Sequence, residues 1–143
     1  MNVASILSVK GRVVFTIEPD RTVSEAAALL STKAIGAVVV CGADGDVHGI
    51  LSERDIVRAI AEDGISALKS PVSQYMTTKV VTAIPDSSVQ HLMEMMTSHR
   101  FRHMPVVENG RLAGLVSIGD VVKWHVEEIE TEHRAMREYI AHT

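Results

Sequence analysis

The chain has 143 residues, 46% of them hydrophobic and 3% aromatic, and its formal net charge is −4 at neutral pH. This length and composition suffice for the core of one domain or of two very small ones. The scarcity of aromatic stacking platforms and the lack of a long basic run argue against a general nucleic-acid or anionic-membrane binder.

Cys41 is the only cysteine, so no intramolecular disulfide can form and a reducing compartment is favoured. Residues 1–12 lack a charged segment followed by a long apolar one, and no stretch of about 18 uninterrupted apolar residues occurs in the chain. We therefore expect a cytoplasmic protein without a membrane segment.

The first half of the chain predicts strands alternating with helices. A short helix is expected within residues 1–12, where apolar residues have helical spacing and Lys10-Gly11 supplies a stop. Further along, strands are predicted at Val13–Ile17, Ala37–Cys41 and Val47–Leu51. Helices are predicted from the capping box at Thr22 to an end near Lys33–Gly36, and from Ser52 to Gly64.

Residues 65–79 are predicted to be a connector, after which the pattern restarts. The second half predicts strands at Val80–Ile84, His103–Val107 and Leu112–Val116, a helix at Val89–Met96, and a hairpin turn at Asn109-Gly110.

Equivalent positions in the two halves show an internal repeat. The separation is 66 residues for Pro19 and Pro85, Val23 and Val89, and Leu30 and Met96, and 65 residues for Gly49 and Gly114, Ser52 and Ser117, and Asp55 and Asp120. We infer two copies of one β-α-β-β-α unit, at 13–64 and 80–125, followed by a helical extension at 126–143. Because each unit alone would bury its core poorly, we expect an α+β fold with the two units packed sheet to sheet in pseudo-twofold symmetry.

The most informative motif in each unit is a strand-to-helix corner. It reads G-I-L-S-E-R-D at Gly49–Asp55 and G-L-V-S-I-G-D at Gly114–Asp120. A helix N-terminus has unpaired N–H donors and a partial positive charge, so such a corner is suited to bind an anion. The alternative is a capping box, in which the serine and the aspartate satisfy the helix start and no ligand is needed.

These motifs resemble those of tandem CBS domains, also called Bateman modules, over about Val13–Lys123. In that family the phrase G-h-x-S/T-x-x-D, with h apolar, is a nucleotide signature, and both corners satisfy it. The resemblance implies a regulatory rather than catalytic role, with AMP, ADP, ATP, NAD or S-adenosylmethionine in the cleft between the units.

Under this resemblance each corner residue has an expected role. Asp55 and Asp120 can accept hydrogen bonds from both hydroxyls of a ribose, while Ser52 and Ser117 suit a phosphate. The expected adenine contacts lie at the strand before the one that runs into each corner. They are Ile35, Gly36, Ala37 and Val38 in the first unit, and Met104 and Pro105 in the second.

Three further residues are candidate phosphate ligands. Arg102 and His103 lie in a segment similar to one in the γ subunit of AMP-activated protein kinase, where a histidine and an arginine contact phosphate. Arg54 lies in a helix first turn, where a cation is unfavourable unless an anion is bound. The alternatives are solvated surface positions for both arginines and a half-buried strand position for His103. Because the units differ at these positions, we expect two sites of unequal affinity.

Other chemistries find less support. The chain has seven histidines, but the proline at 105 argues against a single helix through His99 and His103, so no metal site is expected. No serine or cysteine has a recognisable histidine and acid partner, so no catalytic residues are expected and the protein is not predicted to be an enzyme.

Apolar residues continue beyond the second repeat at alternating spacings of four and three. From Val122 they recur as Val126, Ile129, Met136 and Ile140, with His133 in the remaining place. This spacing predicts one long helix whose apolar stripe either packs on its own subunit or forms a homodimer contact. The leading hypothesis is a stand-alone adenine-nucleotide sensor that signals to an effector protein; the alternative is a structural or interaction module that binds no ligand.

Overall fold

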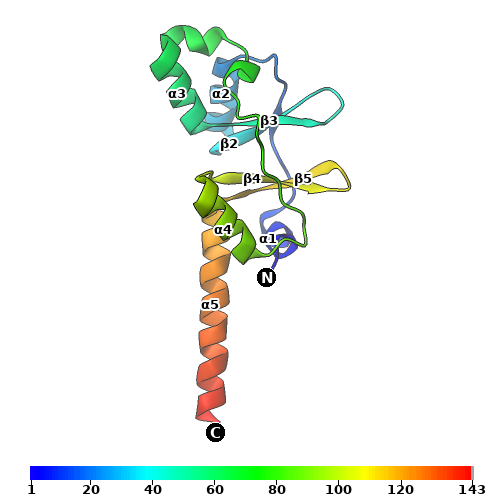
Figure 1. Cartoon of the computed structure of the whole chain (residues 1–143), viewed down its shortest axis with the longest axis vertical. Helices are drawn as coiled ribbons and strands as arrows, with labels where there is room; N and C mark the ends of the chain where they lie inside the picture. Colours follow the sequence, from blue (N-terminus) through cyan, green and yellow to red (C-terminus); the bar gives the residue numbers. More distant parts are fainter. Residues whose placement is uncertain (143) are drawn as a thin grey trace. The chain divides into compact units, whose positions relative to one another are not determined.

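The computed structural model describes residues 1–142, in which five α-helices and two small sheets form a mixed α+β fold (Figure 1). The expected fold class is therefore confirmed. The chain divides into two compact units. The first-repeat unit comprises Val13–Val81 with Glu108–Ala113; the second-repeat unit comprises Met1–Arg12, Thr82–Val107 and the chain from Gly114 onward.

The first-repeat unit is built on a three-stranded sheet in the order β1-β2-β3. Its elements are β1 (Thr16–Ile17), α2 (Val23–Lys33), β2 (Ala37–Cys41), β3 (Val47–Ser52), α3 (Glu53–Asp63) and two short 3₁₀ helices, η1 (Gly64–Lys69) and η2 (Val72–Gln74). β1 runs parallel to β2, and β2 pairs antiparallel with β3 so that Ala37 lies opposite Ser52. The core is aliphatic and includes Val23, Leu30, Val38 and Leu51.

The second-repeat unit contains both ends of the chain. Its helices are α1 (Val3–Lys10), α4 (Val89–His99) and α5 (Ile118–Ala141), and β4 (His103–Glu108) pairs with β5 (Arg111–Ser117). The N-terminal helix thus packs with the second repeat, although it precedes the first repeat in sequence.

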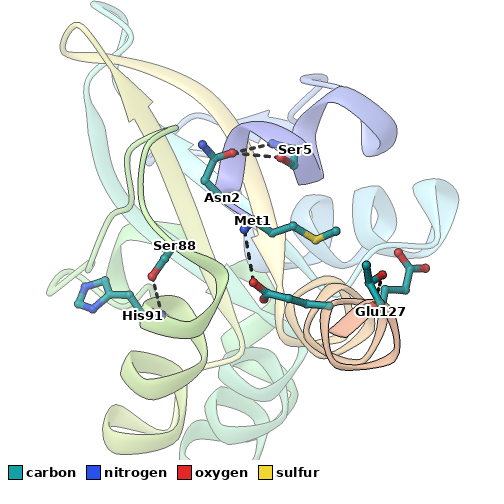
Figure 2. A network of polar contacts seen from close by, with 8 residues as sticks. Met1, Asn2, Ser5, Ser88, His91 and Glu127 are labelled. Atoms are coloured by element: carbon teal, nitrogen blue, oxygen red, sulfur yellow. Dashed lines mark hydrogen bonds and ion pairs between the residues drawn. The ribbon is translucent and has the colours of Figure 1, made fainter. Parts of the chain in front are cut away.

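The starts of α1 and α4, where Figure 2 shows the capping residues Asn2 and Ser88, satisfy each other's backbone. The N–H of Val3 donates to the carbonyl of Ser87, while the N–H of Val89 donates to the carbonyl of Met1. Asn2 caps α1 and Ser88 caps α4, and these two residues form an antiparallel bridge. Because these helix-start donors would otherwise be unpaired, the exchange ties the N-terminus to the second repeat.

The internal repeat is visible in the backbone as well as in the sequence. The C-cap residues that follow α2 and α4 are Ala34 and Arg100, and both are in the left-handed region, with φ of 53° and 59°. A non-glycine residue is uncommon there, so its presence at equivalent positions indicates one shared structural plan.

Two predicted strands are shorter than expected. Val13–Ile17 is a strand only at Thr16–Ile17, and Val80–Ile84 contributes a single parallel bridge between Ala83 and Val106. The residues without strand pairing are mainly the first ones of each predicted strand, at 13–15 and 80–82, whereas Pro19 and Pro85, which have no N–H, follow the predicted ends. The prediction was therefore wrong in the length of both strands.

The long C-terminal helix is present. α5 runs without a break from Ile118 to Ala141, so the second corner and the extension form one helix. The last residue of the expected extension, Thr143, lies outside the described residues.

Candidate functional site

The first corner holds its aspartate in a dense set of hydrogen bonds. Asp55 is 5% exposed, and its Oδ2 accepts from the backbone N–H of Ser52 at 2.8 Å and from the Ser52 hydroxyl at 3.0 Å. Its Oδ1 accepts from Arg58 and, at 3.5 Å, from the hydroxyl of Thr77. The carboxylate is thus fixed by its own helix start and also by two residues outside the motif.

The second corner repeats this geometry with a different cation. Oδ2 of Asp120 accepts from the N–H of Ser117 at 2.9 Å and from its hydroxyl at 3.0 Å. The ammonium group of Lys10, in the last turn of α1, lies 2.6 Å from the same Oδ2 and 2.7 Å from the carbonyl of Leu115. Here the cation comes from 110 residues away in the sequence.

The glycine that opens each motif allows another segment to approach closely. A Cβ at Gly49 would lie 2.6 Å from the carbonyl oxygen of Thr77, and one at Gly114 would lie 2.7 Å from Cδ2 of Leu7. The connector at Thr77 therefore covers the first corner, and α1 covers the second. Thr77 and Lys10 reach the two aspartates from these covering segments.

Few backbone donors remain at each helix start. The N–H of Glu53 donates to the carbonyl of Gly36, and that of Ile118 donates to the carbonyl of Arg102. Each capping box uses the third N–H of its helix, because the N–H groups of Asp55 and Asp120 donate to the hydroxyls of Ser52 and Ser117. Of the first three N–H groups of each helix, only the second, that of Arg54 in α3 and that of Gly119 in α5, has no partner among the described contacts.

The expected adenine-binding residues differ in accessibility. Ile35 and Gly36 are half-buried and reachable from solvent. The side chains of Ala37, Val38 and Met104 are at most 1% exposed, and Pro105 is also buried. These four belong to the sheets and their cores, so Ile35 is the accessible apolar side chain of the set.

The three candidate phosphate ligands lie near the corners. Arg54 is exposed in the first turn of α3, and Arg102 is exposed immediately before β4. His103, the first residue of β4, is half-buried. Since the carbonyl of Arg102 binds the first N–H of α5, Arg102 and His103 lie beside the second corner.

A pocket of about 550 Å³ lies within the first-repeat unit, between α2 and the start of α3. Its lining is mostly apolar and consists of Ala27, Leu30, Ser31, Ala34, Ile35, Glu53, Ile56 and Val57. It includes the expected adenine residue Ile35 and the residue after Ser52, but neither Ser52 nor Asp55 lines it.

Sequence reasoning missed three of the residues that hold the corner carboxylates. Arg58 lies three residues after Asp55 on the same helix, a spacing at which side chains meet, so this ion pair was detectable from the sequence. Thr77 and Lys10 are 22 and 110 residues from their aspartates, and no local pattern indicates either contact.

The surroundings of the second corner shift the pKa of its carboxylate. Burial acts to raise the pKa of Asp120, but the hydrogen bonds from Lys10 and Ser117 outweigh it and hold the pKa below its ordinary value of 3.8. Asp120 is therefore ionised at neutral pH, as an acceptor for ribose hydroxyls must be. Among the described residues no cluster of three or more histidine, cysteine or acidic side chains could hold a metal ion.

The fold and the duplicated corner define a protein made of two repeated α+β units, and comparison with known proteins gives the family. The CBS domain model matches residues 8–62 and 72–127. The chain therefore belongs to the CBS domain family and carries a pair of these domains.

Solved structures and relatives agree with this assignment. The CBS-domain containing protein ATU1752 from Agrobacterium tumefaciens is 52% identical with a TM-score of 0.85, covering 87% of this chain and 99% of that one. The CBS domain pair of protein MJ0100, solved with 5-methylthioadenosine and S-adenosyl-L-methionine, is 25% identical with a TM-score of 0.79, covering 90% and 98% of the two chains. The mitochondrial CBS domain-containing protein CBSX3 of Arabidopsis thaliana is 37% identical over 125 residues, which are 85% of this chain and 61% of that protein.

The matched region is shorter than some of these relatives. It spans 61% of the Arabidopsis protein and 66% of an uncharacterised 17.7 kDa protein of Acidianus ambivalens. No helix among the described residues combines the length and apolar character needed to cross a bilayer.

Proposed function

We propose that this CBS pair is a regulatory module that binds an adenosine-type ligand, with AMP, ATP and NAD as the leading candidates, and that it catalyses no reaction. The observation that carries the proposal is the grouping, at both corners, of a fixed carboxylate, a cation and one unpaired helix-start N–H. A capping box accounts for the free donor, which every capped helix start keeps, but it does not require the cation.

The chemistry of each group fits one part of such a ligand. A carboxylate held in place can accept hydrogen bonds from the two hydroxyls of a ribose. The unpaired N–H of Arg54 or Gly119, at a helix N-terminus, suits a phosphate oxygen, and the exposed Arg54 and Arg102 add positive charge nearby. The adenosine-type ligands bound by the MJ0100 domain pair support the nucleoside part of the proposal.

The two corners should bind with unequal affinity. In the first, both oxygens of Asp55 are engaged, so a ribose must displace Arg58 or Thr77. In the second, the described contacts of Asp120 all fall on Oδ2, which leaves Oδ1 as an acceptor. We therefore expect the second corner to bind more tightly.

The module is further proposed to act as a homodimer that signals to an effector protein through ligand-dependent packing. A ligand can shift such packing only by binding one arrangement more tightly than another. The lone cysteine supports a reducing compartment such as the cytoplasm.

Titration calorimetry on single variants tests the binding site. Asp120→Ala should remove the tighter site for AMP, and Asp55→Ala should remove the weaker one. Asp86→Ala and Asp20→Ala are matched controls, because these exposed aspartates occupy equivalent turns 66 residues apart and lie outside the corners. Unchanged AMP affinity in both corner variants, with folding verified by circular dichroism, would refute the assignment.

One further candidate function is a protein-interaction module that binds no nucleotide. Its support is that both capping boxes are complete and that four of the six expected adenine residues are buried. Thermal unfolding separates the two candidates, because a ligand at 100 times its Kd stabilises by about 2.7 kcal/mol. No shift with AMP, ATP, NAD, S-adenosylmethionine or methylthioadenosine would favour the interaction module.

A further inference from the structure

The exposed apolar stripe of α5 does not face its own unit. α5 packs on α4 and α1 through the buried Val121 and the half-buried Trp124, His125 and Glu128. We call the exposed stripe, which includes one histidine, the seam. Its residues are Val122, Val126, Ile129, His133, Met136 and Ile140. At about 100° per residue, the seam is centred roughly a quarter turn or more from the packed face.

The seam is apolar and exposed along its whole length. Its five hydrophobic side chains are between 43% and 65% exposed. From Val126 to His142, every described residue except Glu128 is exposed, and Figure 1 shows this part of α5 extending beyond α4. A helix in water is stabilised mainly by packing of its apolar face, so this segment calls for a partner.

The spacing of the seam is that of a coiled coil. The steps of four, three, four, three and four residues place the six members at alternating d and a positions over three heptads, 122–142. His133 is the only polar member, and a single polar residue at an a position is a common device for fixing register.

We propose that two copies of this chain pair through the seam as a parallel, in-register, two-stranded coiled coil. This inference rests on the homodimer included in the proposed function and specifies the surface that forms it.

The charges beside the seam favour the parallel arrangement. Glu132 is at a g position and Arg137 is at the following e position, so in a parallel pair each Glu132 faces Arg137 of the other copy. Neither residue has an opposite charge three or four places away on its own helix, and no described contact engages either one. The two charges are therefore available across the seam.

An antiparallel pair with the same overlap brings like charges together. With the a and d layers aligned around the middle of the seam, Glu132 faces Glu132 of the other chain and Glu130 faces Glu130 of the other chain. Lys123 faces Arg137 of the other chain. All three of these charge pairs are repulsive. The parallel arrangement instead forms two attractive charge pairs between Glu132 and Arg137 and none of these repulsive ones.

Sedimentation of the full chain without ligand tests the surface. Met136→Lys places a charge in a d layer and should abolish the dimer, and Arg137→Glu should weaken it by about tenfold, since two attractive pairs become repulsive. Arg134→Gln is the control on the same helix away from the seam, because a charge reversal there would oppose Glu130 and Glu138, four residues away on either side. Equal dimer affinity in the wild type and in all three variants would overturn the proposal.

Two further full-chain variants test the direction of the pair. Adding Glu132→Arg to Arg137→Glu should restore the dimer in the parallel arrangement, because the partners are exchanged. Met136→Cys should form an intermolecular disulfide under mild oxidation, with the wild-type chain and its Cys41 as control. A tighter dimer in Arg137→Glu, or no cross-link at position 136, would overturn the parallel arrangement.

Failure here is distinguishable from failure of the proposed function. AMP affinity, measured by calorimetry on the same variants, should not change by more than about twofold, because the seam lies outside the corner residues. A dimer lost with AMP binding kept supports the seam, and a dimer kept in Met136→Lys rejects the seam whatever the nucleotide result.

Discussion

The ion pair between Lys10 and Asp120 should stabilise the second-repeat unit in a way that depends on pH. Lys10→Met removes a 2.6 Å contact to the carboxylate and a 2.7 Å hydrogen bond to the carbonyl of Leu115. A hydrogen bond to a charged group contributes about 1.5–3 kcal/mol, but the Lys10 side chain is 38% exposed, so solvent screening reduces the expected loss to about 1 kcal/mol.

The sign of the pH dependence follows from the pKa of Asp120, which is held below 3.8. A carboxyl whose pKa is lower in the folded state stabilises the fold above its unfolded pKa, and this stability is lost as the pH falls through the folded pKa. Wild type and Lys10→Met should therefore differ by about 1 kcal/mol at pH 7, and the difference should shrink below about pH 4 as Asp120 is protonated.

Urea denaturation at pH 7 and pH 3 measures both quantities. Lys69→Met is the control, since Lys69 is an exposed lysine in the last turn of a helix and has no described ion pair. A difference between wild type and Lys10→Met that is equal at the two pH values, or no larger than that of the control, would refute this account of the contact.

Three other predictions concern the corners and the sheet. Gly49→Ala should destabilise by about 2–3 kcal/mol and Gly114→Ala by about 1 kcal/mol in urea denaturation, because the first Cβ meets the backbone oxygen of Thr77, whereas the second meets the end of the buried Leu7 side chain, which yields more readily than backbone; equal losses would contradict this. Ser52→Ala and Ser117→Ala should each cost about 1 kcal/mol in the same assay through loss of a helix cap, whereas replacement of the exposed Ser24, which caps no helix, should cost less than about 0.5 kcal/mol. Burial, followed by the charges of Asp44 and Asp46, raises the pKa of the Cys41 thiol. Alkylation by iodoacetamide should therefore be slower than that of a free thiol at pH 7 and should accelerate at alkaline pH. A rate equal to that of free cysteine would show that the thiol is not protected.

Local signals in the sequence predicted much of the fold. The caps at Thr22, Ser52 and Ser117 and the stop at Gly64 lie where they were expected, because each depends on neighbours within a few residues. The lengths of the first strand of each repeat, Val13–Ile17 and Val80–Ile84, were overestimated. β-branched residues indicate an extended chain, but they do not show whether a neighbouring strand offers hydrogen-bond partners.

The site was predictable only in its local part. The serine–aspartate pairs could be read from the motif, and the pairing of Asp55 with Arg58 could have been. The contact between Lys10 and Asp120 depends on α1 packing with the second repeat, which is a property of the tertiary fold. For the same reason the burial of Met104 and Pro105 could not be separated from a role in ligand binding until the strand had a sheet and a core around it.

The placement of α1 with the second repeat affects how the chain matures on the ribosome. Its backbone partners at Pro85, Ser87 and Val89 emerge only after the whole first repeat has been synthesised, and Asp120 emerges later still. Closing so long a loop adds only a slowly growing entropic cost to the finished fold. During that interval the apolar residues Val3, Ile6 and Leu7 lack their final packing, and a nascent chain stalled in the connector would expose them to chaperones.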